Sequence, residues 1–566
     1  MRPMSRSALK VLLAACSCLA HASQPGPEAG IHAEPRVDAF FAAFDQPSAP
    51  GCALGVIRNG EFAYRRGYGV ANLEFDAPIT PQSVFRIGST SKQFTATAIA
   101  LLAEDGALSL DDPISRYFSG FPQWAQSVTV RHLVHHTSGI PDYLELAFLA
   151  GKSDDTDYYT DEWVIELLAR QQRTLFPPGQ RHAYSNSGYV LLAHIVRQAS
   201  GQSLSDFAEA RIFGPLGMQD THFHDDHGRV VPRRASGYAP AGDGYRISMT
   251  TLDIVGDGGV FTTIDDLLAW DRNFHENRLG RGGPGLIRQL TTPGALNGGE
   301  PTDYAFGLDV GDFRGLATTS HSGSYVGYRA EMIRFPEQRF SVAVLCNRSD
   351  ADAPHLARQV AAVYLADSLA PEDQGPAAPA GEAGVALTAA DLAQYAGDYW
   401  EDAEAFAAET RVEDGKLWAV HSPTRRNELA PIGPDRFRML GVPGDVAVHF
   451  DRDAGGVRAM RLTIDGKPRG TFRPFRRRQA AADELAGYSG TYYSPELDVT
   501  YTLGLSSGAL TFRVAHRPPL ELTPMFDETF ENPDYGAFTF GRSADGAIDG
   551  FVLQQRGAGS LKFSRQ

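Results

Sequence analysis

A serine and a lysine three positions apart, in Ser89-Thr90-Ser91-Lys92, stand at the start of a segment with helical apolar spacing. Three residues are close to one helical turn, so this spacing places the Lys92 amine on the same face as the Ser89 hydroxyl. An amine that takes a hydroxyl proton makes the serine a nucleophile. The motif is weak alone, because Ser7-Ala8-Leu9-Lys10 matches it too.

Two further motifs follow, and each occurs once in the chain. Tyr184-Ser185-Asn186 lies between a Pro-Pro-Gly turn and a helical pattern, which predicts side chains that project from a loop. His321-Ser322-Gly323 precedes an apolar run and is predicted at the edge of a strand. A core tyrosine and a structural histidine are the alternatives for each motif taken singly. The three motifs together favour one serine-nucleophile site.

The elements that must position these motifs form one mixed α/β unit over residues 31–366. An apolar strand, the turn Asn59-Gly60 and a second strand predict a hairpin near its start. Helices are predicted after Ser89 and over residues 189–199, and a second hairpin over residues 331–346. Strands at both ends, with helices between them, predict an antiparallel sheet that the two ends of the unit complete.

The rest of the chain divides into a linker and two repeats. Pro, Ala, Gly and Glu dominate residues 367–385, which we interpret as a linker. Residues 386–476 and 485–566 then share one pattern at a constant offset of 93 residues, as in the pair Tyr395 and Tyr488. Short alternating strands and Gly/Asp turns in each copy predict two small antiparallel β barrels.

The N-terminus predicts export. A basic start that ends at Lys10 precedes an apolar stretch over residues 11–20, and Ala20-His21-Ala22 fits a cleavage site, so residues 1–22 are interpreted as a signal peptide. A lipoprotein site at Cys16 is less favoured, because only five apolar residues separate it from the last basic residue. The apolar segments after residue 22 are too short to span a bilayer. We expect a periplasmic or secreted protein with no integral membrane span.

Charge and metal-ligating residues exclude several function classes. A formal net charge of −16 argues against nucleic acid or an anionic membrane as the main partner, because both need a positive patch. Three histidines within residues 221–228 are interpreted as a polar surface loop, because nothing there fixes tetrahedral zinc geometry. We therefore expect no metal and no cofactor.

The motifs together resemble the serine β-lactamase and penicillin-binding superfamily, in the branch of class C β-lactamases, D-alanyl-D-alanine carboxypeptidases, D-aminopeptidases and related esterases. The resemblance covers residues 45–366 and is carried by the phrases Phe85–Lys92, His135–Ile140, Pro178–Gly179, Tyr184–Tyr189, Gly258–Thr263, Asp265–Leu267 and His321–Tyr328. It implies an α/β catalytic domain with an antiparallel sheet of five or more strands flanked by helices. A catalytic domain followed by two barrels resembles the domain order of bacterial D-aminopeptidases.

The resemblance also implies a role for the motif residues. Ser89 would form an acyl-enzyme, while Lys92 and Tyr184 share the general-base work, and which of them takes the proton stays open. Asn186 would hold the substrate amide. The backbone N–H groups of Ser89 and Ser324, which follows Gly323, would form the oxyanion hole.

The resemblance implies that His321 belongs to the catalytic residues with Ser89, Lys92 and Tyr184, and that Gly323 binds substrate together with Asn186 and Ser324. His321 differs, however, from the residue found in one branch of the family. It replaces the lysine of the K-T-G motif in class C β-lactamases, and a mostly neutral imidazole does not hold a carboxylate as a permanent cation does. The predicted function is therefore a serine hydrolase acting on amide or peptide bonds of D-amino-acid substrates. An esterase or β-lactamase of the same superfamily is the first alternative, and a non-catalytic cell-wall peptide binder is the second. The expected partner is a small peptide, amide or ester substrate.

Two cysteines would remain after removal of the signal peptide, Cys52 and Cys346. The family's sheet implies that their strands lie side by side and antiparallel, so the two Cα atoms would come within the ~4.4–6.8 Å that a disulfide requires. Export would expose both to oxidising conditions. Two separate buried thiols are the open alternative.

Overall fold

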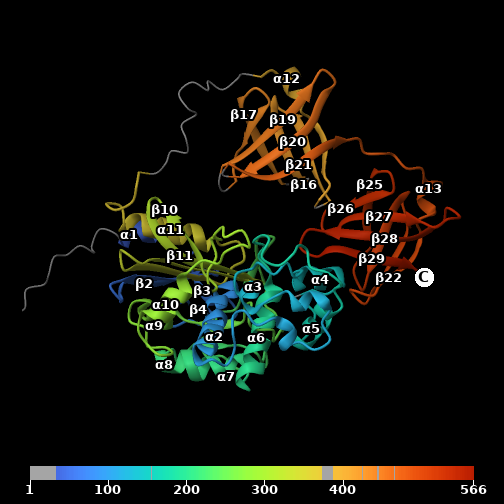
Figure 1. Cartoon of the computed structure of the whole chain (residues 1–566). Coiled ribbons are helices and arrows are strands. Elements are labelled where there is room, and N and C mark those ends of the chain that lie inside the picture. Colours follow the sequence, from blue (N-terminus) through green and yellow to red (C-terminus); the bar gives the residue numbers. More distant parts are fainter. Residues whose placement is uncertain are drawn as a thin grey trace, which may run out of the picture.

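The computed structural model describes residues 34–153, 156–371, 387–403, 405–422, 425–442, 445–464 and 466–566. They form an N-terminal α/β domain and two β barrels (Figure 1). The predicted signal peptide and residues 372–385 of the predicted linker lie outside this range. Within it, no helix has the length and apolar character to cross a membrane.

The α/β domain is built on a six-stranded antiparallel sheet in the order β10-β11-β12-β13-β1-β2, which confirms the predicted sheet shared by both ends of the unit. Its strands are β1 (Cys52–Arg58), β2 (Glu61–Tyr68), β10 (Asp309–Phe313), β11 (Leu316–Tyr325), β12 (Tyr328–Phe335) and β13 (Phe340–Cys346). Shorter strands outside the sheet are β3 (Val70–Asn72), β4 (Ala77–Pro78), β5 (Phe85–Arg86), β6 (His222–Phe223), β7 (Tyr238–Ala241), β8 (Gly244–Ile247) and β9 (Val260–Thr262).

Helices cover both faces of the sheet. Alternate residues of the neighbouring strands β1 and β13 face opposite sides: Leu54 and Val344 pack with helices α1 and α11, whereas Ala53 and Leu345 belong to the core of the helical region. Because these strands are buried on both faces, their sequences are continuous apolar runs. The helices are α1 (Glu34–Phe40), α2 (Lys92–Asp105), α3 (Val130–Val134), α4 (Tyr143–Leu149), α5 (Asp161–Ala169), α6 (Asn186–Ser200), α7 (Leu204–Ala208), α8 (Gly214–Leu216), α9 (Ile264–His275), α10 (Pro284–Thr291) and α11 (Ala353–Tyr364).

Local sequence signals account for the ends of these elements. Asn59 and Gly60 both have positive φ, as a two-residue hairpin turn requires, and they join β1 to β2. Helices α2 and α6 each end at a glycine in the left-handed conformation. The hairpin predicted over residues 331–346 is the pair β12 and β13.

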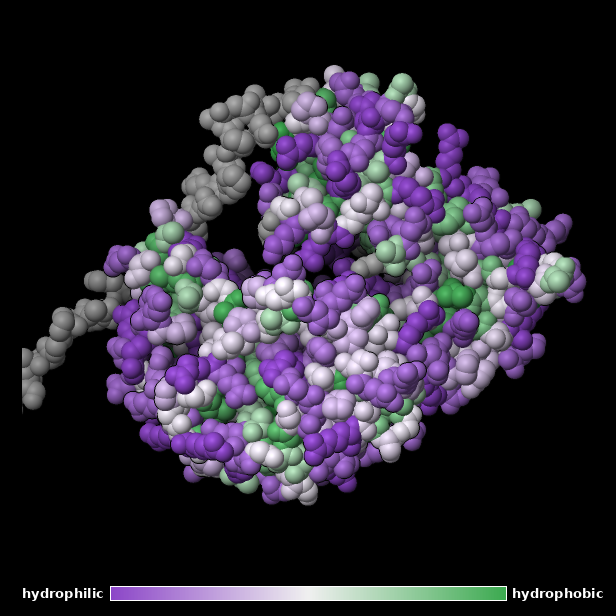
Figure 2. Space-filling model, viewed as in Figure 1, coloured by the Kyte–Doolittle hydropathy of each residue, from purple (hydrophilic) through white to green (hydrophobic). Residues whose placement is uncertain are grey.

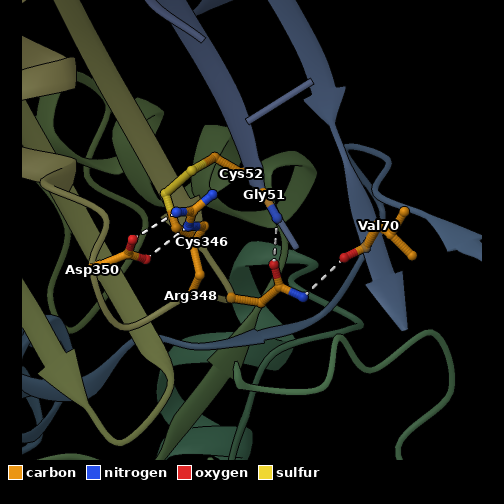
Figure 3. Close-up of a disulfide and its surroundings, with 7 residues drawn as sticks. Gly51, Cys52, Val70, Cys346, Arg348 and Asp350 are labelled. Atoms are coloured by element: carbon orange, nitrogen blue, oxygen red, sulfur yellow. Dashed lines mark hydrogen bonds and ion pairs between the residues drawn. A yellow bond between two sulfur atoms is a disulfide. The ribbon is translucent and has the colours of Figure 1, made fainter. Parts of the chain in front are cut away.

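Cys52 and Cys346 face each other in register across β1 and β13 and form a disulfide (Figure 3). Their Cα atoms are 4.0 Å apart, closer than the expected range and than the about 4.5 Å that is typical of a non-hydrogen-bonded pair of opposed residues in antiparallel strands. Next to the bridge, the Asn347 amide oxygen accepts the Gly51 N–H at 2.8 Å and its nitrogen donates to the Val70 carbonyl at 3.1 Å. The ends of the α/β domain are thus tied together twice.

Removing this bridge is expected to destabilise the α/β domain. The loop it closes spans 294 residues, so cross-linking restricts the unfolded chain strongly, and the loss is expected to be about 2–4 kcal/mol. We expect the Cys52→Ala, Cys346→Ala double variant to unfold at lower urea concentration than the oxidised wild type. Reductant should lower the urea concentration at which the wild type unfolds and should leave that of the double variant unchanged. Two free thiols titrated in the unfolded, unreduced wild type would contradict the bridge.

The C-terminal third forms two closed eight-stranded barrels in which successive strands pair antiparallel, as the repeats predicted. The first is preceded by α12 (Ala389–Ala393) and contains β14 (Gly397–Glu401), β15 (Phe406–Glu413), β16 (Lys416–Ser422), β17 (Arg425–Gly433), β18 (Arg436–Met439), β19 (Val446–Asp453), β20 (Gly456–Ile464) and β21 (Lys467–Phe475). The second is preceded by α13 (Ala482–Ala486) and contains β22 (Gly490–Ser494), β23 (Val499–Ser506), β24 (Ala509–Val514), β25 (Leu520–Phe526), β26 (Thr529–Asn532), β27 (Gly536–Arg542), β28 (Ile548–Gln555) and β29 (Gly559–Arg565).

The two barrels share side-chain contacts at equivalent positions. In the first, Tyr395 donates from its hydroxyl to Asp435 at 2.7 Å. In the second, Tyr488 donates to Glu528 at 2.6 Å, and both members of this pair are again 93 residues further on. The repeat in the sequence therefore reflects a repeated structure.

The second barrel packs on the α/β domain beside α4 and α5 (Figure 1). Tyr501 donates to the Leu149 carbonyl at 2.7 Å, and Arg517 donates to the Lys152 carbonyl at 2.8 Å while lying 4.2 Å above the Phe148 ring. Its apolar core is continuous with that of the helical region. Elsewhere, the face seen in Figure 2 is mostly hydrophilic, with scattered hydrophobic residues.

Substitution of Arg517 by alanine is expected to weaken this interface. The change removes a hydrogen bond to a main-chain carbonyl and a cation–π contact, together worth about 1–3 kcal/mol. Arg513→Ala, at an exposed position of β24, is the matched control. Limited proteolysis should cleave between the α/β domain and the second barrel sooner in Arg517→Ala than in the control. Equal cleavage rates would contradict the inferred role of Arg517.

Candidate active site

Ser89 stands where β5, α2 and β11 meet. It lies in a 3₁₀ turn over Gly88–Ser91 that leads directly into α2. Gly88 has a φ of 51°, and a Cβ there would lie 2.8 Å from the backbone nitrogen of Ser324. A Cβ at Gly323 would collide with the Ile87 carbonyl. Gly88, directly before the first motif, and Gly323 of the third motif therefore allow the Ser89 turn to touch β11.

The Lys92 amine is buried and contacts three oxygen atoms. It lies 3.1 Å from Ser89 Oγ, 2.9 Å from Asn186 Oδ1 and 2.6 Å from the Asp257 carbonyl oxygen. The first two contacts join residues that the sequence analysis named from separate motifs. The third fixes the amine from a residue that the sequence analysis did not name.

Burial decides the protonation of Lys92. It disfavours the charged ammonium and lowers the pKa of Lys92 to about 8, although the carboxylates of Asp257 and Asp142 act in the opposite direction. Burial also raises the pKa of both carboxyl groups. A lysine with a pKa near 8 is available as a neutral amine close to physiological pH, which suits a general base.

Tyr184 presents its ring to the site from the loop before α6. The Lys92 amine lies 4.8 Å from the centre of this ring, and the His136 imidazole packs against it at a tilt, with the ring centres 4.2 Å apart. His136 also accepts the Ser185 N–H at 3.2 Å and so holds the loop. Burial raises the pKa of the Tyr184 phenol well above its usual value, and a hydrogen bond with Ser89 opposes this only in part. The phenol is thus protonated at neutral pH.

His321 lies inside β11, opposite Met332 of β12, and not at the strand edge that the sequence suggested. Its Nε2 is 2.9 Å from the Tyr304 hydroxyl and its Nδ1 is 2.6 Å from the Ser322 carbonyl. Burial lowers the pKa of His321 to about 3, so the ring is neutral. A neutral ring donates from Nδ1 to the carbonyl and accepts at Nε2 from the tyrosine. His321 is therefore a positioning residue with both ring nitrogens engaged.

Asn186 is held by a carboxylate that the sequence analysis did not identify. Asp142 accepts the Asn186 backbone N–H at 2.7 Å and its side-chain amide at 3.0 Å. The backbone N–H of Asp142 donates in turn to the Gly557 carbonyl of the second barrel at 2.9 Å. The amide of Asn186 is thereby oriented with its oxygen toward Lys92, and the barrel contacts the residue that orients it.

Ser89 is partly exposed and opens into a small pocket. Ser324 and Asn186 line the same pocket, and the Ser324 backbone nitrogen lies close to Gly88, the residue before the nucleophile. Asp257 also lines it, and its carboxylate accepts a hydrogen bond from Tyr143 at 3.0 Å. The structure thus brings Ser89, Lys92, Tyr184 and Asn186 together, with Ser324 beside them.

Several residues of the site escaped sequence analysis: Arg86, Asp142, Tyr143, Asp257 and Tyr304. Arg86 and Asp257 each had a local signal, since Arg86 lies within the phrase Phe85–Lys92 and Asp257 directly precedes the phrase Gly258–Thr263. Asp142, Tyr143 and Tyr304 lie in unremarkable sequence, and only the fold brings them to Ser89.

The family model described as Beta-lactamase matches residues 37–365, more than half of the chain. The chain belongs to this family. Penicillin-binding protein 4* of Bacillus subtilis (strain 168) is 32% identical over 414 residues, which cover 70% of this chain and 89% of that protein. Together with the Ser89 site, membership makes the chain a serine hydrolase.

Two further relatives match over different extents. A D-aminopeptidase of Gluconobacter oxydans (strain 621H) is 31% identical over 341 residues, which span 60% of this chain and 63% of that enzyme. The octameric penicillin-binding protein homologue from Pyrococcus abyssi superposes with a TM-score of 0.55 at 27% identity, covering 78% of this chain and 99% of that structure. The match to this solved structure extends beyond the α/β domain.

Proposed function

We propose that this serine hydrolase cleaves amide or peptide bonds of D-amino-acid substrates through an acyl-enzyme on Ser89. The observation that carries the proposal is the 3.1 Å contact between Ser89 Oγ and a buried amine whose pKa is about 8. D-Amino-acid specificity is supported by the similarity to D-aminopeptidases. The neutral His321 makes β-lactam hydrolysis a weaker candidate, because it leaves no cation at the lysine position of class C enzymes.

The reaction follows from the contacts of Ser89. Lys92 Nζ takes the hydroxyl proton while Ser89 Oγ bonds to the carbonyl carbon. The resulting oxyanion accepts hydrogen bonds from the backbone N–H groups of Ser89 and Ser324. The C–N bond then breaks, and the proton passes from the Lys92 ammonium, with the Tyr184 hydroxyl beside it, to the leaving nitrogen. Water hydrolyses the ester on Ser89 by the same proton transfers in reverse.

Two measurements test this proposal. Mass spectrometry after a fluorophosphonate probe should find the adduct on Ser89. Among D-alanyl peptides, D-aminoacyl amides, short esters and a chromogenic cephalosporin, the D-amino-acid amides and peptides should have the highest kcat/KM, above their L enantiomers. A higher kcat/KM for the ester or the cephalosporin would contradict the proposed substrates and would assign esterase or β-lactamase activity instead. A chain that takes no label and hydrolyses nothing would favour a non-catalytic peptide binder.

We also propose export, with cleavage after Ala22, as the N-terminal sequence indicates. The disulfide between Cys52 and Cys346 supports it, because such bridges persist in oxidising compartments. N-terminal sequencing of protein from the periplasm or the medium should begin at Ser23. Protein retained in the cytoplasm with an intact N-terminus would contradict export.

The pH dependence of kcat/KM tests Lys92 as the base. Only the neutral amine accepts the Ser89 proton, so kcat/KM should fall about tenfold per pH unit below about 8 and level off above it. Removal of a nearby negative charge disfavours the ammonium, so Asp257→Asn should move this limb to lower pH. A limb that stays in place in Asp257→Asn would show that another group titrates.

A further inference from the structure

Arg86 carries a buried positive charge beside the nucleophile. It ends the short strand β5, three residues before Ser89, is only 4% exposed, and lines the same pocket as Ser89. Its guanidinium lies 4.4 Å from the centre of the Tyr325 ring and 6.0 Å from that of Phe261. These rings hold the side chain in place but do not satisfy its N–H groups.

No anion within the described part of the chain neutralises Arg86. No carboxylate of these residues comes within ion-pair distance of it, and its buried Nε has no hydrogen-bond partner there. The Asp257 carboxylate is close enough to be influenced by the Arg86 charge, but its hydrogen bond comes from Tyr143. A desolvated guanidinium without a partner is costly, and a carboxylate is the group that its planar donors match.

Arg86 also lines a second pocket. It measures about 200 Å³, and Arg234, His224 and His227 also line it. No acidic side chain lines this pocket, although Asp253 pairs with His227 at 3.0 Å from outside the lining. Arg234 has no ion-pair partner among the described residues either. In a chain of net charge −16, two arginines without carboxylates mark a local positive site.

We propose that Arg86 and Arg234 form an anion-binding subsite, which binds a carboxylate that the substrate carries next to the scissile bond. The subsite deepens the proposed D-amino-acid hydrolase function and rests on it. His321 supplies no cation, so Arg86, which lines the same pocket as Ser89, takes over the task that a lysine at position 321 would have. The preferred substrates are therefore acidic: a dipeptide with a free C-terminus, or a D-amino acid with a carboxylate side chain.

Matched pairs of substrates test the subsite. D-Alanyl-D-alanine is compared with its C-terminal amide, and D-glutamic acid α-amide with D-glutamine α-amide, so that each pair differs in one carboxylate. In at least one pair, Arg86→Met should lower kcat/KM for the acid at least about tenfold more than for the neutral partner. Arg86→Lys should restore part of this difference. Arg229→Met, which removes an exposed charge near His224 outside the pocket, should behave as wild type.

Protection of Ser89 separates this inference from the proposed function. D-Alanine should slow fluorophosphonate labelling of the wild type at a concentration at least about tenfold lower than D-alaninamide does, and Arg86→Met should abolish this difference. The readout needs no turnover. If D-alanine protects Ser89 better than D-alaninamide does but no D-amino-acid substrate is hydrolysed, the proposed hydrolase function is refuted and the subsite is supported. Equal protection by acid and amide in the wild type, or an unchanged difference in Arg86→Met, would overturn the subsite.

Discussion

Ser89→Ala is expected to reduce turnover of every substrate to background, a loss of about 10⁴-fold or more, because no other oxygen stands at the position of attack. The Lys92 amine contacts Ser89 Oγ directly, and replacement of a small side chain at a partly exposed position leaves the surrounding core unchanged. The thermal unfolding midpoint should therefore stay close to that of the wild type. Labelling by a fluorophosphonate should disappear together with activity.

A matched control separates chemistry from folding. Ser109→Ala removes the same hydroxyl at an exposed position beyond the C-terminal end of α2, and should keep both labelling and activity. Full labelling of Ser89→Ala would locate the nucleophile at another residue. Loss of labelling in Ser109→Ala would point to general damage to the fold.

Loss of either proton-transfer group is expected to cost at least about 100-fold in kcat. Lys92→Ala removes the amine that contacts Ser89 Oγ, Asn186 and Asp257, and leaves two buried carboxyl groups without their countercharge. Tyr184→Phe removes only a hydroxyl and keeps the ring that packs against His136. The two variants therefore differ in how much of the local structure they disturb.

The pH profile of Tyr184→Phe distinguishes the two roles. If Lys92 is the base, this variant keeps the rise in kcat/KM near pH 8 at a lower overall rate, and Lys92→Ala loses the rise. Circular dichroism and the unfolding midpoint serve as controls for folding, since Lys92 is buried. A near-normal rate in either variant would assign that residue a structural role.

The sequence alone determined the parts of this protein whose signals are local. The turn at Asn59-Gly60, the helix that begins at Lys92 and the 93-residue repeat all follow from neighbouring residues or from a fixed period. The sheet followed from strands at both ends of one unit. The S-x-x-K spacing placed Lys92 next to Ser89 because a helical turn fixes that distance.

Only the tertiary structure decided which distant residues meet at the site. Asp142 orients Asn186, the Tyr304 hydroxyl hydrogen-bonds to His321, and the Asp257 carbonyl contacts Lys92. Nothing in the sequence spacing of these residues links the members of each pair. The pKa of a lysine or histidine depends on how completely the whole fold removes it from water, and no short segment specifies this. For the same reason, the missing partner of Arg86 became visible only when all facing elements were in place. The family resemblance implied that Cys52 and Cys346 lie close together, and the register of β1 and β13 decided that they form a disulfide.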